Sequence, residues 1–164
     1  MNMFGSVLHD LPILLARQGL TLSTAESCTG GLVAHWMTEI PGSSEWYKGG
    51  IVAYANEWKS GLLGVDTDLL DRVGAVSAEV AEAMARNAAA RFQTDLAIST
   101  TGIAGPGGGS AEKPVGLVYI GRHGFGQTTV RREVWTFDRS GNKEASAQLA
   151  IEMIVDLLRS KFPS

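Results

Sequence analysis

Segments with helical periodicity alternate with short apolar runs along almost the whole chain, and this alternation constrains the fold more than any other feature. Apolar residues recur at helical spacing over residues 7–18, and Gly19 ends that segment. A strand-length run follows over residues 20–25. Helices that interleave with strands pack on both faces of a sheet. The pattern therefore predicts an α/β protein, with a three-layer α/β/α sandwich on a mixed, mostly parallel sheet.

The later segments complete this pattern. Further helices are predicted over residues 29–40, 57–64, 78–92 and 143–161, and further strands over residues 51–55, 96–100, 116–122 and 128–137. Ser77 is placed to cap the helix that begins after it. The last two strands flank Gly124 to Gly126 as a hairpin, which introduces antiparallel pairing and makes the predicted sheet mixed.

Length and composition limit the classes of function. The 164 residues fit one domain, residues 1–164, and the net charge of −3 offers no excess of positive charge for nucleic acid. No apolar run approaches the roughly 18 residues that span a membrane. With Cys28 as the one cysteine and no leader pattern, we expect a cytoplasmic protein. The three histidines lie far apart in sequence, so no metal site is expected.

Three segments carry polar groups that are suited to a binding or catalytic site. The first is the loop over residues 101–110, which holds five glycines and follows a predicted strand. Glycine lets backbone N–H groups approach an anion closely. The loop matches neither a Walker nor a Rossmann fingerprint, because no Lys-Ser/Thr follows its last glycine and a strand follows the loop. Phosphate binding and a plain wide turn both remain open.

The second segment is Thr24-Ala25-Glu26-Ser27-Cys28-Thr29-Gly30-Gly31, at a strand-to-helix turn. Its hydroxyl groups are placed to cap the helix or to bind a substrate. Cys28 has no histidine near it in sequence, so a small packed side chain is the better interpretation than a nucleophile.

The third segment contains Ser44, Tyr54 and Lys59. A lysine with a lowered pKa can take the proton of a serine hydroxyl, and the resulting pair hydrolyses amides without metal. If the strand at residues 51–55 folds the chain back on itself, the three side chains converge at the sheet edge. The alternative is a solvated helix lysine and a turn serine, which spacing alone favours. Asn56 also has a structural alternative, as a helix cap.

Taken together, the three segments resemble the C-terminal domain of the CinA (competence/damage-inducible) family, including its stand-alone nicotinamide mononucleotide deamidases. The resemblance covers residues 11–158. The blocks that carry it, besides the turn at residues 24–31, are Gly42-Ser43-Ser44 with Gly49-Gly50, Tyr54, Asn56 and Lys59, Gly74 to Ser77, Thr101 to Pro106 with Gly108-Gly109, Lys113 to Gly116, and Asp138-Arg139.

This resemblance implies hydrolysis of the carboxamide of nicotinamide mononucleotide to nicotinate mononucleotide and ammonia, a step of NAD salvage, without metal or cofactor. It implies Ser44 as nucleophile, Lys59 as base and Tyr54 close by. We expect Tyr54 to help pass a proton to the departing ammonia, and Ser27 is the alternative nucleophile. The positions expected to hold the substrate are Ser27, Thr29, Gly30, Asn56, Thr101, Gly102, Gly105, Arg139 and Lys143. The partner is then a small-molecule nucleotide, with no nucleic acid and no membrane.

Two positions depart from the family pattern. Lys143 stands where an arginine is common, which keeps the charge but loses the two-pronged grip on phosphate. Trp58 is bulkier than the expected small neighbour of Lys59. We expect a homo-oligomer, and Trp36, Trp46 and Trp58 fit either an interface or the core. Two other functions stay open: a binding module without turnover, and an amidase for another pyridine nucleotide.

Overall fold

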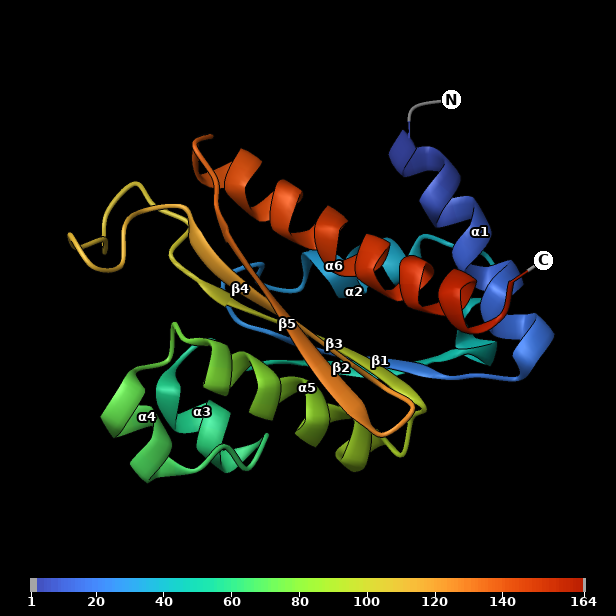
Figure 1. The fold of residues 1–164 in the computed structure, drawn as a ribbon, viewed down its shortest axis with the longest axis horizontal. Coiled ribbons are helices and arrows are strands. Elements are labelled where there is room, and N and C mark those ends of the chain that lie inside the picture. The colour runs from blue at the N-terminus through green and yellow to red at the C-terminus, as the bar shows by residue number, and fades with distance from the viewer. Residues whose placement is uncertain (1–2, 164) are drawn as a thin grey trace.

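The computed structural model describes residues 3–163, which form one five-stranded sheet flanked by helices (Figure 1). In chain order the elements are α1 (Met3–Gln18), β1 (Leu22–Glu26), α2 (Leu32–Thr38), the 3-10 helix η1 (Ser43–Glu45), β2 (Tyr47–Val52), α3 (Asn56–Gly61), α4 (Thr67–Val73), α5 (Ala78–Phe92), β3 (Leu96–Gly102), β4 (Leu117–Gly124), β5 (Gln127–Val134) and α6 (Arg139–Lys161). None of the described helices is both long enough and apolar enough to span a membrane.

The strands lie in the order β2-β1-β3-β4-β5. β1 is parallel to β2 on one side and to β3 on the other, whereas the pairs β3/β4 and β4/β5 are antiparallel. The sheet is therefore mixed, as predicted, but the expectation that it is mostly parallel is wrong, since only two of its four pairings are parallel. The parallel half brings the carboxyl ends of β1, β2 and β3 to the same edge.

Helices cover both faces of the sheet, so the three-layer prediction is confirmed. Figure 1 shows α1, α2 and α6 on one face and α3, α4 and α5 on the other. Each face has its own apolar core. Leu11, Leu15 and Ile151 belong to the first core, and Val80 and Met84 to the second.

Helix caps explain which predicted boundaries hold. The helix over residues 78–92 is confirmed, and the Ser77 hydroxyl accepts a hydrogen bond from the Val80 N–H at 3.4 Å. The last helix begins four residues earlier than predicted, because the Asp138 carboxylate accepts from the Gly141 N–H at 2.8 Å and caps it there. α4 was not predicted from the sequence.

The strand predicted over residues 51–55 lies instead at Tyr47–Val52 and includes a pair of glycines. The reason is a close approach between strands. A Cβ atom at Gly50 would lie 2.1 Å from the Thr24 hydroxyl oxygen, which itself is hydrogen-bonded to the Tyr47 hydroxyl at 2.7 Å. Glycine is thus required here for packing within a strand, although in sequence it is typical of a loop.

The glycine-rich loop returns to the sheet at Gly116, which limits side chains at that position. Gly116 has a φ of 89°, and an added Cβ would lie 1.9 Å from the Trp135 carbonyl oxygen. Gly126, in the β4–β5 turn, has a similar φ of 76° but open space around its Cβ position.

Substitutions at these two glycines distinguish the cost of backbone strain from the cost of a steric clash, because both have positive φ but only Gly116 has a close neighbour at its Cβ position. We expect Gly126→Ala to lower the free energy of unfolding by only about 1 to 2 kcal/mol, because alanine is strained at positive φ. Gly116→Ala should lower it by at least about 3 kcal/mol, because the strand must also move away from Trp135. Urea denaturation followed by circular dichroism measures both. Equal losses would contradict the predicted contact.

Candidate active site

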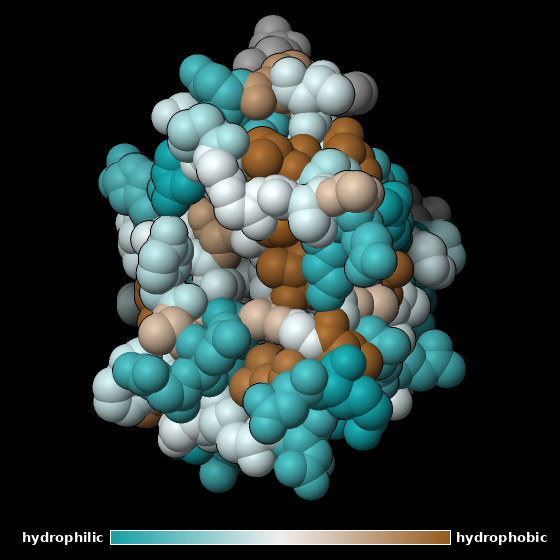
Figure 2. Space-filling view, turned by 90° about the vertical axis from the view of Figure 1, so that its left-hand side faces the viewer, coloured by the Kyte–Doolittle hydropathy of each residue, from teal (hydrophilic) through white to brown (hydrophobic). Residues whose placement is uncertain are grey.

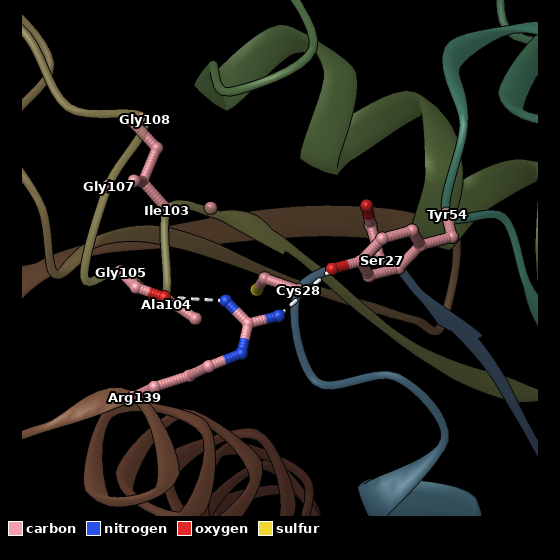
Figure 3. A pocket seen from close by; sticks show the side chains of 10 residues that line it. Ser27, Cys28, Tyr54, Ile103, Ala104, Gly105, Gly107, Gly108 and Arg139 are labelled. Carbon is pink, nitrogen blue, oxygen red and sulfur yellow. Dashed lines mark hydrogen bonds between the residues drawn. The ribbon is translucent and has the colours of Figure 1, made fainter.

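A cavity of about 260 Å³ opens where the carboxyl ends of β1 and β3 meet the glycine-rich loop. Figure 3 shows the residues that line it, which are Ser27, Cys28, Tyr54, Gly102, Ile103, Ala104, Gly105, Gly107, Gly108 and Arg139. Ligands of open α/β sheets bind outside the carboxyl ends of the strands. Five of the residues predicted from the sequence line this cavity: Ser27, Tyr54, Gly102, Gly105 and Arg139.

Ser27 is positioned by the sheet. It follows β1 directly, and its backbone N–H donates to the Thr100 carbonyl at 2.9 Å, which extends the pairing of β1 with β3 by one residue. Ser27 is 8% exposed and lines the cavity. Its hydroxyl makes no hydrogen bond to any residue in the described range 3–163. The hydroxyl is thus available to a ligand.

Glu26 fixes the turn that carries Ser27. Its side chain is 1% exposed and accepts four hydrogen bonds. They come from the Thr29 hydroxyl at 2.6 Å and the backbone N–H groups of Gly31, Val33 and Ala34 at 3.0, 3.1 and 2.8 Å. The carboxylate thereby satisfies the free N–H groups at the start of α2, where a negative charge is stabilised. Sequence analysis had assigned it no role.

Lys59 is buried at the same edge of the sheet. Its side chain is 1% exposed, and its ammonium group donates to the carbonyl oxygens of Ala53 at 3.0 Å and Tyr54 at 3.3 Å. Ala53 is hydrogen-bonded through its N–H to the Glu26 carbonyl at 2.8 Å, one residue before Ser27. This bond joins the Lys59 segment to the Ser27 turn.

The surroundings of Lys59 favour its neutral form. Burial lowers the pKa of the Lys59 amine from its ordinary value of 10.5, while the nearby Cys28 thiol acts more weakly in the opposite direction. None of the salt bridges within residues 3–163 involves this lysine. A buried amine that is held by carbonyl groups rather than carboxylates loses its proton more readily than an exposed lysine does, which is the property that a general base needs.

Arg139, the first residue of α6, crosses the mouth of the cavity. Figure 3 shows its guanidinium group between the glycine-rich loop and Tyr54. It donates to the Gly105 carbonyl at 2.6 Å and to the Tyr54 hydroxyl at 3.0 Å. Tyr54 is 60% exposed, so its hydroxyl lies at the entrance with Arg139. The prediction that Tyr54 passes a proton to the leaving group gains no support from this contact.

The structure does not bring Ser44 to this site, so the predicted convergence of Ser44 with Lys59 and Tyr54 is wrong. Ser44 lies in η1, before β2, whereas Tyr54 and Lys59 follow β2. β2 runs straight alongside β1 in parallel register, and a strand of six residues spans about 20 Å. Ser44 is exposed near the amino end of β2, where its carbonyl accepts a hydrogen bond from the Lys48 ammonium group.

Two predicted binding residues have structural roles instead. Thr29 is fully buried, and its hydroxyl contacts Glu26 and the Thr100 hydroxyl, both at 2.6 Å. The Thr101 hydroxyl is buried too and donates to the Ala75 carbonyl at 2.8 Å, which holds the segment before α5 against the sheet. Neither hydroxyl faces the cavity.

Three further positions lie around the site in different ways. Asn56 lines a separate groove between α3 and α4, outside the cavity. The Lys143 amine lies 3.6 Å from the position that a Cβ on Gly30 would occupy, so these two predicted residues are neighbours across the α2 and α6 starts. Trp58 is 50% exposed beside Lys59. Its bulk does not enter the interior in which Lys59 is buried.

Cys28 lines the cavity but belongs to the apolar core, as predicted. Burial raises the pKa of its thiol to about 12, so the nucleophilic thiolate is scarce at neutral pH. Trp46 lies in the core and Trp36 packs against it, which leaves Trp58 as the exposed member of the three tryptophans. Among residues 3–163, no three His, Cys, Asp or Glu side chains are grouped as metal ligands.

A serine hydroxyl and a buried lysine at one edge of a sheet are the groups that a Ser/Lys hydrolase uses. The model of the CinA C-terminal domain matches residues 6–158, and the chain belongs to this family. A competence-damage inducible protein of Moorella thermoacetica is 53% identical over 148 residues, and a CinA-like protein of Leptospira borgpetersenii is 45% identical over 157. The alignments cover 90% and 93% of this chain but only 36% and 37% of those proteins.

Solved structures of the family have the same fold. The competence/damage inducible protein CihA of Agrobacterium tumefaciens superposes with a TM-score of 0.91 at 41% identity, covering 94% of both chains. A CinA superfamily protein of Escherichia coli superposes with a TM-score of 0.90 at 30% identity, covering 94% of this chain and 90% of that one. The resemblance inferred from the sequence motifs is therefore confirmed.

The role of Glu26 is tested by Glu26→Gln, which keeps the shape of the side chain. The amide nitrogen must face at least one backbone N–H of α2, so a buried donor loses its acceptor. We expect the free energy of unfolding, measured by urea denaturation, to fall by about 2 to 4 kcal/mol. The control is Glu79→Gln in the first turn of α5, an exposed side chain whose loss should cost only about 0.5 kcal/mol. Equal costs would contradict this role.

Proposed function

We propose that this chain is a metal-independent serine amidohydrolase that converts nicotinamide mononucleotide and water to nicotinate mononucleotide and ammonia. The observation that carries the proposal is the buried Lys59, which has a lowered pKa and is hydrogen-bonded to the segment paired with the Ser27 turn. The family resemblance described above supplies the substrate. The relatives from Moorella thermoacetica and Agrobacterium tumefaciens are named for competence and damage, not for an activity.

The geometry favours Ser27 over Ser44 as the nucleophile. Ser27 opens into the cavity, and its hydroxyl has no hydrogen-bond partner among residues 3–163. It lies beside the strand end that leads to Lys59. Ser44 is separated from Lys59 by the length of β2. The catalytic pair in this proposal is therefore Ser27 with Lys59.

The proposed reaction is acyl transfer through a covalent intermediate. Neutral Lys59 takes the proton of the Ser27 hydroxyl while the hydroxyl oxygen attacks the amide carbon. The Ile103 N–H is engaged with the Leu117 carbonyl, so in this proposal the backbone N–H groups of Ala104 and Gly105 stabilise the oxyanion, for which one donor is worth about 3 kcal/mol. The C–N bond then breaks, and the Lys59 ammonium returns its proton to the departing ammonia. Water hydrolyses the ester in the same way and regenerates Ser27.

Positive charge at the mouth of the cavity suits a phosphate. Arg139 already lines the cavity, and Lys143 lies next to Gly30 one turn further along α6. The cavity volume of about 260 Å³ lies just below the range of roughly 300 to 1,000 Å³ that is usual for small-molecule sites. The carboxamide is then directed inward toward Ser27, and the ribose phosphate outward toward Arg139.

Serine substitutions test the choice of nucleophile. We expect Ser27→Ala to lower the turnover number for ammonia release from nicotinamide mononucleotide by about 10⁴-fold or more. Ser44→Ala, a matched change of an exposed serine, should keep a turnover number within about twofold of wild type. A coupled glutamate dehydrogenase assay measures ammonia. An active Ser27→Ala protein with an inactive Ser44→Ala protein would overturn the assignment.

The pH dependence tests the base. Because Lys59 must be neutral to accept a proton, kcat/KM should rise with pH up to the lowered pKa of Lys59 and then level off. Lys59→Arg should not restore activity, since arginine keeps its proton. A profile without a rising limb below pH 10.5 would contradict the role of Lys59.

Stability provides a second measurement that does not depend on turnover. Between the lowered pKa of Lys59 and its ordinary 10.5, the unfolded chain binds more protons than the folded protein does. The free energy of unfolding should therefore rise with pH across this window. Lys59→Met should remove that part of the pH dependence, and an unchanged slope would show that Lys59 does not titrate abnormally.

A further inference from the structure

A second cavity, of about 480 Å³, adjoins the candidate active site. The two share Ala104 and Arg139, and the loop passes from Gly105 in the first cavity to Pro106 in the second. The other lining residues are Val115, Phe137, Asp138 and Ser140. A ligand that fills the first cavity can thus continue into the second past the Arg139 side chain.

Phe137 is the unusual residue of this second cavity. It is 59% exposed and lines the cavity. An exposed apolar side chain in a surface hollow is suited to contact a ligand. Its ring stacks on Trp135 with the centroids 6.4 Å apart and an angle of 25° between the planes. The Trp135 indole N–H donates to the Ser146 hydroxyl at 2.9 Å, which fixes the pair. An aromatic surface is therefore held in place beside the site.

The boundary between the cavities is positively charged. Arg139 lines both, and Lys143 lies one turn further along α6 with its amine near Gly30. Asp138 also lines the second cavity, and its carboxylate accepts the Gly141 N–H at the start of α6. Figure 2 views the molecule from this side and shows apolar residues along the middle of the face, with hydrophilic residues on both flanks.

We propose that the second cavity is a subsite for a flat heterocyclic ring, joined through a ribose and a diphosphate bridge to the pyridine nucleoside in the first cavity. The ligand class is a dinucleotide, with its second base against Phe137 and its phosphates beside Arg139. Flat rings stack on aromatic side chains with little regard to their substituents, and Arg is suited to phosphate. This inference rests on the proposed function, which places the pyridine ring near Ser27.

The test compares two ligands, nicotinamide adenine dinucleotide and nicotinamide mononucleotide, by isothermal titration calorimetry. All proteins carry Ser27→Ala, so that no turnover takes place during the titration. We expect the dinucleotide to bind more tightly than the mononucleotide. Phe137→Ala should raise the Kd of the dinucleotide at least about fivefold more than that of the mononucleotide, because a stacking partner is lost.

Phe137→Tyr is the matched control, because it keeps the ring, and the ratio of the two Kd values should stay within about twofold. Val115 lines another wall of the cavity, and Val115→Ala should also weaken binding of the dinucleotide more than binding of the mononucleotide. This second variant replaces Phe137→Ala in the test if Phe137→Ala does not fold. If the dinucleotide binds no more tightly, or both ligands lose affinity equally, the subsite is overturned. A separate outcome concerns the proposed function: it fails if the wild-type protein releases no ammonia from the mononucleotide, whatever the ratio of the two Kd values.

Discussion

The burial of one lysine is the constraint on which the candidate site depends. Within the described part of the chain, the Lys59 amine has only carbonyl oxygens for partners, those of Ala53 and Tyr54, and both belong to the segment that leaves β2. A charged amine in such surroundings is costly, which lowers its pKa. The same segment is hydrogen-bonded to Glu26, so the position of the amine and the position of Ser27 are set by a single pair of parallel strands.

Glu26 supplies the second fixed point. Its four hydrogen bonds hold the start of α2 against the end of β1, and the turn between them carries Ser27. Thr29 was expected to contact the substrate, but its hydroxyl is hydrogen-bonded to Glu26 and Thr100 within this network. The site is thus rigid where the chemistry is proposed and open where Arg139 and Tyr54 meet across the entrance. The exposed Phe137 extends that entrance into the second cavity.

Local signals in the sequence predicted most of the fold, whereas most of the candidate-site residues were expected from the family resemblance. The Ser77 cap and the alternation of helices and strands require only neighbouring residues, and the turn at Ser27 was found in the same way. The error at Ser44 arose because a spacing of 15 residues does not reveal whether the chain reverses or runs straight. The first part of β2 was not predicted, because glycines are typical of a loop and the contact of Gly50 with Thr24 exists only between strands. Glu26 was identifiable as an acidic residue before a helix start, a position that favours negative charge.

The pKa of Lys59 tests the central claim most directly. Lysine labelled with ¹³C at Cε reports its own protonation by NMR, and Lys59→Met identifies the resonance by its loss. The account predicts that Lys59 titrates below the ordinary value of 10.5. A Lys59 resonance that titrates at or above 10.5 would leave Ser27 without a base and contradict the proposed mechanism.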